Sequence, residues 1–216
     1  MARAGRTPPG GKTAGKLTSK GAQTQHRIVA AAAELMFEGG VGGTTMEMVR
    51  AAARVSSSQI YHYFADKETL VRAVIEYQNE TIVGGQEPML AKLDSVPGLR
   101  AWRDFLVEHQ RQLGCRGGCP IGALGSELAE IDPQARAAVA GGFGRWEAGI
   151  RGGFQAMRDR GELGQDASPD RLATTMLAAL QGGLLLSQVQ RSTAPLEVAL
   201  DTVIDHISAQ MAPAGS

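Results

Sequence analysis

Helical periodicity dominates the pattern of apolar and polar positions along the chain. From Thr24 onward, apolar side chains recur three and four positions apart, a spacing that places them on one face of an α-helix. No stretch shows the sustained alternation that is typical of a half-buried strand. The clearest stripes cover residues 28–36, 70–82, 99–113, 139–157 and 196–211. The pattern therefore predicts an all-α protein with about nine helices.

Capping residues and glycines divide this pattern into elements. Thr44 and Glu47 have the spacing of a capping box, which predicts a short helix over 46–53. Ser56 or Ser57 is suited to cap a second short helix over 57–63, and Asp66 to cap a long one. Further boundaries are predicted at glycine pairs and at cap-proline pairs: Gly39-Gly40, Gly42-Gly43, Asp132-Pro133 and Ser168-Pro169.

Residues 172–190 form the longest uncharged stretch of the chain. The stretch is long enough to cross a bilayer, but its threonine, glutamine, glycine and serine residues make it a poor lipid-facing span. We expect a helix that is buried in protein on more than one side, and no membrane partner. Because residues 1–25 also lack the apolar centre of a secretory signal, we expect a cytoplasmic protein.

The net charge of zero hides an asymmetry between the two ends of the chain. Residues 1–72 carry ten Lys/Arg against five Asp/Glu, a balance of +5, whereas residues 73–216 carry twelve against seventeen, a balance of −5. The basic end is suited to a polyanion. Its first 23 residues hold five Lys/Arg and no acid, which predicts a disordered tail that either adds affinity for nucleic acid or is simply solvated.

The two short helices predicted at 46–53 and 57–63 have the layout of a helix-turn-helix. Only residues 54–56 join them, and in this motif the second helix enters the DNA major groove. Ser57, Ser58 and Gln59 are small or flexible enough to face the bases there, and their polar atoms can hydrogen-bond to base edges. Ile60 and Phe64 are four positions apart and would hold the helix against the domain.

The residues around these two anchors are suited to the phosphate backbone. Tyr61 and Tyr63 reach outward, where they offer hydroxyls to phosphates or ring faces to thymine methyl groups. Lys67 stands at the start of the next helix and can pair with a phosphate.

The sequence at this point resembles a known family. The run TTMEMVRAAARVSSSQIYHYFADKETLVRAVIE, preceded by AAAELMFEGGVGGTT, is similar to the DNA-binding domain of TetR-family bacterial regulators over roughly residues 24–76. The resemblance implies an all-α homodimer that binds double-stranded operator DNA and a small-molecule effector. It also implies phosphate contacts by Thr45, Tyr63 and Lys67. The residues that it places at or near the bases are Ser57, Ser58, Gln59, Tyr61 and His62.

The expected organisation has three parts. Residues 1–23 form the disordered basic tail, residues 24–72 the helix-turn-helix DNA-binding domain, and residues 73–212 a ligand-binding and dimerisation domain. The helices at 170–190 and 195–211 are expected to form a four-helix bundle with the same helices of a partner subunit.

Two arginines depart from the family pattern. The family usually has alanine and glycine at the positions of Arg50 and Arg54. Glycine at the end of the second helix suits a left-handed turn, so arginine there is conformationally unfavourable. Each arginine either contacts a phosphate or is solvated, and the sequence leaves both readings open.

A second, shorter resemblance concerns the C-terminal domain. The segment CRGGCPIGALGSELAE, residues 115–130, resembles one found in the LmrA-like subgroup of the family, where a Gly-Cys-Pro run precedes a short helix. This resemblance implies a drug-like or aromatic effector.

Large aromatic and soft side chains gather in the helices of this domain. Such helices can line an apolar cavity with a few polar groups, although stripes at helical spacing also arise from plain core packing. His109 lies on an apolar helix face, which favours a hydrogen-bonded histidine in the core over a ligand contact. The candidate ligand contacts are Trp102, Phe105, His109, Phe143, Trp146, Met176 and Gln181.

No cofactor, metal site or catalytic motif is predicted. Cys115 and Cys119 are interpreted as two thiols in a turn, with a redox switch or a metal pair as alternatives. The four histidines lack metal-ligand spacing, and no phosphate-binding glycine loop, nucleophile elbow or HExxH motif occurs, so an enzyme is not expected.

The leading hypothesis is a ligand-responsive DNA-binding transcriptional regulator. Its simplest form is a repressor that a small hydrophobic or aromatic effector releases from the operator, although activation is also compatible with the sequence. The alternative is a small-molecule binding protein of the same fold without specific DNA binding.

Overall fold

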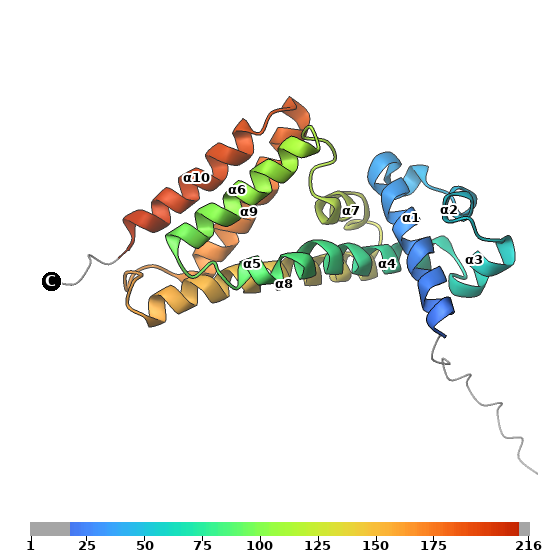
Figure 1. Ribbon diagram of the computed structural model, residues 1–216, viewed down its shortest axis with the longest axis horizontal. Coiled ribbons are helices and arrows are strands. Elements are labelled where there is room, and N and C mark those ends of the chain that lie inside the picture. The colour runs from blue at the N-terminus through green and yellow to red at the C-terminus, as the bar shows by residue number, and fades with distance from the viewer. Residues whose placement is uncertain (1–17, 212–216) are drawn as a thin grey trace, which may run out of the picture.

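In the computed structural model, which describes residues 18–211, the first three helices form a small bundle at one end of the molecule (Figure 1). They are α1 (Ser19–Gly43), α2 (Met46–Ala53) and α3 (Ser57–Tyr63), and α1 packs against α2. Buried apolar side chains from all three, among them Ile28, Val49 and Ile60, form the centre of the bundle. The two short helices have the bounds that their capping residues predict.

α1 begins earlier than the sequence pattern predicts. Thr18 is its N-cap, and the hydroxyl oxygen of Thr18 accepts a hydrogen bond from the backbone N–H of Gly21 at 3.2 Å. The expected disordered tail over 1–23 is therefore wrong for residues 19–23, because a local cap stabilises this first turn without large apolar side chains. Residues 1–17 of the expected tail lie outside the described residues.

The C-terminal part of α1 is kinked at Gly40. The backbone of Gly40 has a φ of 75°, a left-handed conformation that glycine adopts readily, and residues 41–43 continue the helix beyond it. The glycine pairs therefore bend α1 and do not end it at residue 39. Thr44 follows α1 directly, so the kink lies only a few residues before the start of α2.

α4 (Lys67–Gln78) leads from the bundle into the larger helical domain, and its continuation changes helix type. A π-helical turn (Asn79–Val83), a 3₁₀ turn (Gly84–Gln86) and the single-turn α5 (Glu87–Leu90) follow it. The buried side-chain amide of Asn79 donates to the carbonyl oxygen of Ala138 in α8 at 3.2 Å. The apolar stripe over 70–82 gives no sign of this change, since a contact with a distant helix accompanies it.

Five further helices complete the described chain. They are α6 (Val96–Gln112), α7 (Pro120–Leu128), α8 (Pro133–Asp159), α9 (Pro169–Gln190) and α10 (Ala194–Ala209). α8 packs along α4, α9 packs against α8 and α10, and α6 packs against α10 (Figure 1). Residues 18–211 thus contain nine α-helices of seven or more residues besides α5, which confirms the all-α prediction.

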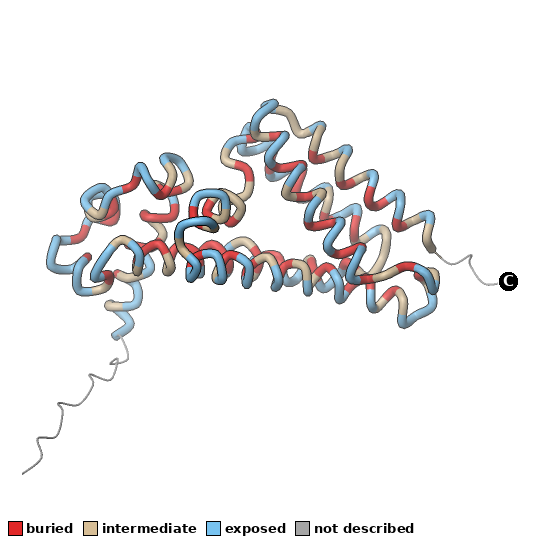
Figure 2. The backbone as a smooth tube through the Cα atoms, turned by 180° about the vertical axis from the view of Figure 1, so that it is seen from behind, coloured by how far each residue is buried: buried red, intermediate tan, exposed pale blue. Residues whose placement is uncertain are grey.

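The core runs through both ends of the molecule. Buried residues form one connected cluster from α1 to α10, and they occupy the inward faces of the helices (Figure 2). α7 contacts both α1 and α8, so a short helix links the small bundle to the larger domain.

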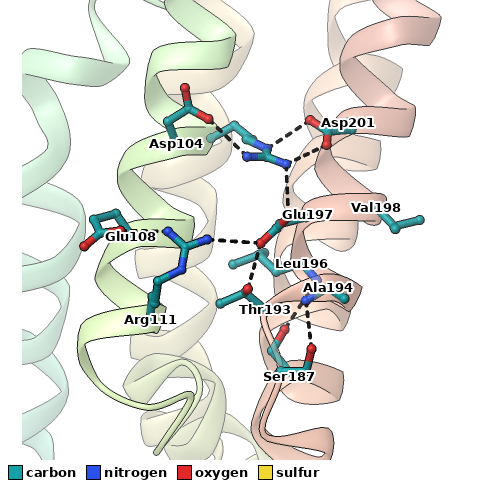
Figure 3. A network of polar contacts seen from close by, with 12 residues as sticks. Asp104, Glu108, Arg111, Ser187, Thr193, Ala194, Leu196, Glu197, Val198 and Asp201 are labelled. Carbon is teal, nitrogen blue, oxygen red and sulfur yellow. Dashed lines mark hydrogen bonds and ion pairs between the residues drawn. The ribbon is translucent and has the colours of Figure 1, made fainter.

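Ion pairs hold α6 against α10 (Figure 3). The guanidinium of Arg103 donates two hydrogen bonds to the carboxylate of Asp201, at 2.9 and 2.6 Å. These bonds raise the pKa of Arg103 further above its ordinary value. Beside them, Arg111 lies 3.5 Å from a carboxylate oxygen of Glu197, which also accepts a hydrogen bond from the hydroxyl of Thr193 at 2.7 Å.

Within residues 18–211, α9 is the one helix that is long and apolar enough to cross a membrane by length and composition. Its inner residues, such as Met176 and Leu180, are fully buried within the protein. On its outer face, the side chains of Leu186 and Val189 are 50% and 72% exposed. α9 is therefore packed as a core helix on one side and presents an apolar surface on the other.

Candidate nucleic-acid interface and effector cavity

α3 is anchored by two apolar side chains, which leave its other residues outside. Ile60 and the C-cap residue Phe64 are 1% and 2% exposed, so they pin the helix to the bundle. The structure places all five candidate base contacts on the exposed surface: Ser57, Ser58, Gln59, Tyr61 and His62. α3 thus presents a polar face without large aliphatic side chains, as a helix in the major groove requires.

A capping box orders the start of α3. The Ser56 hydroxyl oxygen accepts from the backbone N–H of Gln59 at 3.2 Å, and the Gln59 side-chain oxygen accepts from the backbone N–H of Ser56 at 2.9 Å. Bidentate pairing of a glutamine with adenine uses both its oxygen and its amide nitrogen. Such pairing by Gln59 therefore requires the box to open, whereas its amide nitrogen is available with the box closed.

The three candidate phosphate contacts stand at the ends of three elements. Thr45 is the exposed N-cap of α2, and its hydroxyl oxygen accepts from the backbone N–H of Met48 at 3.2 Å. Tyr63 ends α3, where its half-buried ring meets the ring of His62 edge-on with centroids 5.0 Å apart. Lys67 is the half-buried first residue of α4.

Asp66 sets the position of Lys67 by capping α4. Its carboxylate accepts a hydrogen bond from the backbone N–H of Thr69 at 2.7 Å, and this bond is the main reason that the pKa of Asp66 lies below its ordinary value. Asp66 is therefore ionised at neutral pH, where its charge also complements the N-terminal dipole of α4.

Of the two arginines that depart from the family pattern, Arg50 makes side-chain contacts within the domain, whereas the side chain of Arg54 is exposed. Arg50 pairs with Glu47 through two hydrogen bonds, which lower the pKa of the Glu47 carboxyl and raise that of the guanidinium. It also reaches the carbonyl oxygen of Val55 in the turn, at 3.5 Å. Arg54 has a left-handed backbone with φ of 52°, as its position after α2 requires.

Arg27 contributes to this domain in a way that sequence patterns do not reveal. From α1, its guanidinium donates to the carbonyl oxygen of Ala53 at 2.9 Å and so caps the C-terminus of α2. Arginine in the first helix is not by itself a signal of such a contact, since the two residues are 26 positions apart.

A cavity of about 400 Å³ lies in the C-terminal domain. Three of the candidate ligand contacts, Phe105, His109 and Trp146, line it. The π-helical and 3₁₀ turns after α4 form part of its wall through Ile82 and Gln86. Sequence reasoning did not name the remaining wall residues as ligand contacts: Phe37, Thr81, Ile82, Gly85, Gln86, Leu106, Gln110, Leu113, Gly118, Cys119, Pro120 and Leu184.

A second cavity, of about 380 Å³, adjoins the first. Phe143 and Gln181 line it, and Phe37 and Cys119 line both cavities. The remaining two candidates do not line either one. Met176 is fully buried in the core, and Trp102 is a wall support, since its indole N–H donates to the side-chain oxygen of Gln86 at 2.9 Å.

The expectation of a hydrogen-bonded core histidine at position 109 is wrong. His109 is exposed, and its ring stacks on the ring of Phe105 with centroids 6.2 Å apart and planes 8° apart. Phe105 is itself 44% exposed and lines the cavity with His109, whereas Leu99, Trp102 and Leu106 of the same stripe are buried in the core.

Residues that line the two cavities carry buried polar atoms without a protein partner. The indole N–H of Trp146 and the side-chain oxygen of Gln110 are buried without a hydrogen-bond partner, and both residues line the larger cavity. The amide nitrogen of Gln181, in the smaller one, is in the same state. Buried polar groups normally have partners, so these atoms favour a ligand or water that supplies them.

Cys119 is the N-cap of α7, where its sulfur accepts from the backbone N–H of Gly122 at 3.4 Å. Burial raises the pKa of this thiol above its ordinary value. Cys119 is therefore a neutral thiol at neutral pH, which is unfavourable for reaction with oxidants or for metal binding. Cys115 is also a free thiol and is buried.

A groove of about 650 Å³ lies between α4 and the turn from α7 to α8. Its lining includes the charged side chains of Lys67, Glu68, Arg72 and Asp132. It is therefore less suited to an apolar ligand than the two cavities.

Comparison with known proteins finds two family descriptions that match separate parts of the chain. Residues 95–203 match the family described as "Tetracyclin repressor-like, C-terminal domain", and residues 28–74 match "Bacterial regulatory proteins, tetR family". The chain belongs to the TetR family. This TetR-family protein is accordingly a transcriptional regulator with a DNA-binding N-terminal domain and a ligand-binding C-terminal domain.

Named relatives of this TetR-family protein are regulators as well. It is 28% identical to the transcriptional regulator AcuR of Cereibacter sphaeroides over 171 residues, or 78% of each chain. It is 26% identical to the HTH-type transcriptional repressor DhaR of Mycobacterium sp. (strain GP1) over 84% of this chain and 90% of that one.

Solved structures show the same fold. A TetR transcriptional regulator from Chloroflexus aurantiacus J-10-FL has a TM-score of 0.77 at 28% identity and covers 91% of this chain and 100% of its own. The regulatory protein TetR from Rhodobacter sphaeroides has a TM-score of 0.75 at 26% identity, over 85% of this chain and 98% of its own.

Proposed function

We propose that this regulator is a repressor that leaves its operator when a small hydrophobic or aromatic effector occupies the C-terminal cavity. One observation carries the proposal: an exposed polar recognition face on α3 is joined, within one connected core, to an apolar cavity of about 400 Å³. A ligand acts on such a molecule only through its different affinities for the DNA-binding and the released conformation.

For DNA recognition, the proposed unit is residues 24–72, extended by the first turn of α1. Bases are contacted from the exposed face that begins at Ser57, and phosphates are contacted by Thr45, Tyr63 and Lys67. The N-terminal ends of α2 and α4, which carry two of these three residues, add a favourable dipole for phosphate.

For the effector, the cavity walls supply the chemistry. Stacked rings of Phe105 and His109 and the ring of Trp146 suit a flat apolar molecule. The unpartnered N–H of Trp146 and oxygen of Gln110 suit an effector with one hydrogen-bond acceptor and one donor. We therefore propose an uncharged, flat effector that carries both kinds of group.

The subgroup is also a proposal. The Gly-Cys-Pro run of residues 118–120 leads directly into the short helix α7, and Cys119 lines both cavities. This arrangement supports a place near the LmrA-like regulators, whose effectors are drug-like or aromatic.

We further propose that the chain acts as a homodimer in the cytoplasm and has no enzymatic activity. Exposed apolar side chains on α9 and α10 support a subunit interface on these helices in residues 73–212: Leu185, Leu186, Val189 and Val198. A two-fold dimer also matches a palindromic operator with half-sites about one helical turn apart or somewhat more.

The experiment that tests this function uses the full-length protein and the intergenic DNA upstream of its own gene. With excess nonspecific competitor, we expect binding to survive, and the uncharged aromatic dye N-phenyl-1-naphthylamine to become fluorescent in the cavity and to lower the affinity for DNA. A folded dimer that takes up the dye but selects no duplex, even from a random pool, would support the alternative, a binding protein without specific DNA recognition.

A further inference from the structure

Phe37 belongs to α1, a helix of the DNA-binding bundle, yet its half-buried ring lines both cavities of the C-terminal domain. We propose that the DNA-binding domain itself completes the effector site through this ring, and that displacement of the ring by an effector is what disturbs DNA binding. The inference rests on the proposed function and adds to it the residue through which the two sites meet.

The ring of Phe37 lies directly on the loop between α6 and α7. A Cβ atom on Gly117 would stand 1.9 Å from the Cζ atom of Phe37, so no other residue fits there without moving the ring. Gly117 is followed by Gly118 and Cys119, which line the larger cavity. The ring and the cavity wall are therefore in direct contact, and an effector has no free space to take up on this side unless one of them moves.

The end of α1 beyond Phe37 is held by α7. The backbone N–H of Val41 donates to the carboxylate of Glu127 at 2.8 Å, and that of Gly42 approaches the same oxygen at 3.5 Å. Met36, beside Phe37, is 4% exposed. Because the backbone on both sides of Phe37 is held in this way, a displaced ring pushes on the end of α1 and on α7.

The held segment leads straight to the DNA-binding surface. The hydroxyl of Thr44 donates to the carbonyl oxygen of Gly40 at 2.9 Å, and the next residue, Thr45, is the N-cap of α2. A shift at Phe37 is thus passed over a few residues of the chain to the start of the helix-turn-helix. In a dimer, a small rotation of each bundle changes the spacing of the two α3 helices, on which operator affinity depends.

A substitution that imitates the effector tests this path without any ligand. Gly117→Ala pushes against the ring of Phe37, so we expect affinity for the selected operator duplex to fall about tenfold, within the usual range of such couplings. Phe37→Leu removes the outer ring atoms and leaves an apolar side chain. In the Phe37→Leu background, Gly117→Ala should therefore change affinity by less than about threefold.

Gly114→Ala is the matched control. Gly114 lies in the same loop and has a similar left-handed φ, 61° against 83° at Gly117, but no atom lies within 4 Å of where its Cβ would stand. Gly114→Ala therefore introduces comparable backbone strain without touching Phe37, and its operator affinity should stay near that of the wild type. Melting curves and dimer mass verify that each variant is folded.

A second arm uses the dye N-phenyl-1-naphthylamine. In the wild type, the dye should lower operator affinity. In Phe37→Leu the dye should still bind, but the decrease in operator affinity that it causes should be several-fold smaller. Equal damage by Gly114→Ala and Gly117→Ala, no rescue by Phe37→Leu, or full release of Phe37→Leu by the dye would each overturn the inference. A wild type that selects no operator, or that the dye does not release, would instead overturn the proposed function.

Discussion

At the scale of single residues, the turn of the helix-turn-helix requires a left-handed backbone at position 54 but places no demand on the side chain. Arg54 closes α2 with φ of 52° and ψ of 51°, and its backbone N–H bonds back to the carbonyl oxygen of Ala51 at 3.2 Å. A residue with a Cβ atom is strained in this region by about 1–2 kcal/mol. Because the Arg54 side chain is exposed, nothing in its surroundings offsets that strain.

Arg54→Gly should therefore stabilise the protein. We expect an increase of about 0.5–1 kcal/mol in the free energy of unfolding, since the greater freedom of glycine in the unfolded chain cancels part of the relief. Urea denaturation at fixed protein concentration measures this free energy of unfolding.

Arg191→Gly is a matched control at the same φ of 52°. Arg191 also donates to the carbonyl oxygen of Cys115 at 3.0 Å, so its replacement loses a hydrogen bond and should stabilise less, or not at all. A lower stability for Arg54→Gly than for the wild type would contradict the strain that we assign to this turn.

At the scale of elements, we expect the contact between α6 and α10 to depend on one half-buried arginine more than on the number of ion pairs. Arg103 is 18% exposed and binds Asp201 in a bidentate manner. Arg100, one turn earlier, makes a single contact with Asp205 at 2.9 Å, and both side chains are largely exposed, at 49% and 68%. Exposed single pairs contribute little because water screens them.

Arg103→Ala should lower the free energy of unfolding by about 1–2 kcal/mol, since two charge-assisted hydrogen bonds and a partly buried carboxylate lose their partner. Arg100→Ala should change it by less than about 0.5 kcal/mol. Paired urea denaturation curves make the comparison, and equal losses in the two variants would show that burial and bidentate geometry do not matter here.

The sequence predicts those elements whose ends are determined locally. Ser56, Asp66, Asp132 and Ser168 each cap a helix as their neighbouring residues suggest, because a capping bond spans only two or three residues. The π-helical turn at Asn79 is not visible in this way, since it is accompanied by a bond to Ala138, 59 positions away.

The same distinction applies to the candidate site. The polar face of α3 follows from the positions of Ile60 and Phe64, two anchors within one short helix. The cavity wall contains Phe37, which the pattern of α1 marks only as one more apolar residue. Its place in the C-terminal domain depends on how α1 packs against α7, and no local rule contains that contact.

At the scale of the whole molecule, α9 and α10 together present four exposed large apolar side chains: Leu185, Leu186, Val189 and Val198. Val189 and Val198 are 72% and 65% exposed, and the inner faces of both helices are already buried. Two copies that pack these faces together form a four-helix bundle, and a two-fold axis then presents each residue of the interface twice.

Val189→Glu should convert the dimer into a folded monomer. In the protomer, position 189 is exposed, so the substitution should not affect folding. In the dimer it places two carboxylates in the apolar interface, so we expect the dimer dissociation constant to rise at least about tenfold. Ile131→Glu is the control, because Ile131 is 76% exposed but lies in the turn between α7 and α8. Sedimentation at several concentrations distinguishes the two variants, and a stable Val189→Glu dimer would place the interface elsewhere.

The DNA interface is tested most directly by the salt dependence of operator binding in variants of Lys67 and Tyr63. Lys67→Ala should weaken binding to every duplex alike and should reduce the slope of log affinity against log salt by about one. Tyr63→Ala should weaken binding with little change of slope, because it removes no charge. Lys92→Ala, which removes an exposed lysine from the far domain, should leave both quantities unchanged. Operator affinity that survives both Lys67→Ala and Tyr63→Ala would contradict the assignment of the DNA interface to the α3–α4 surface.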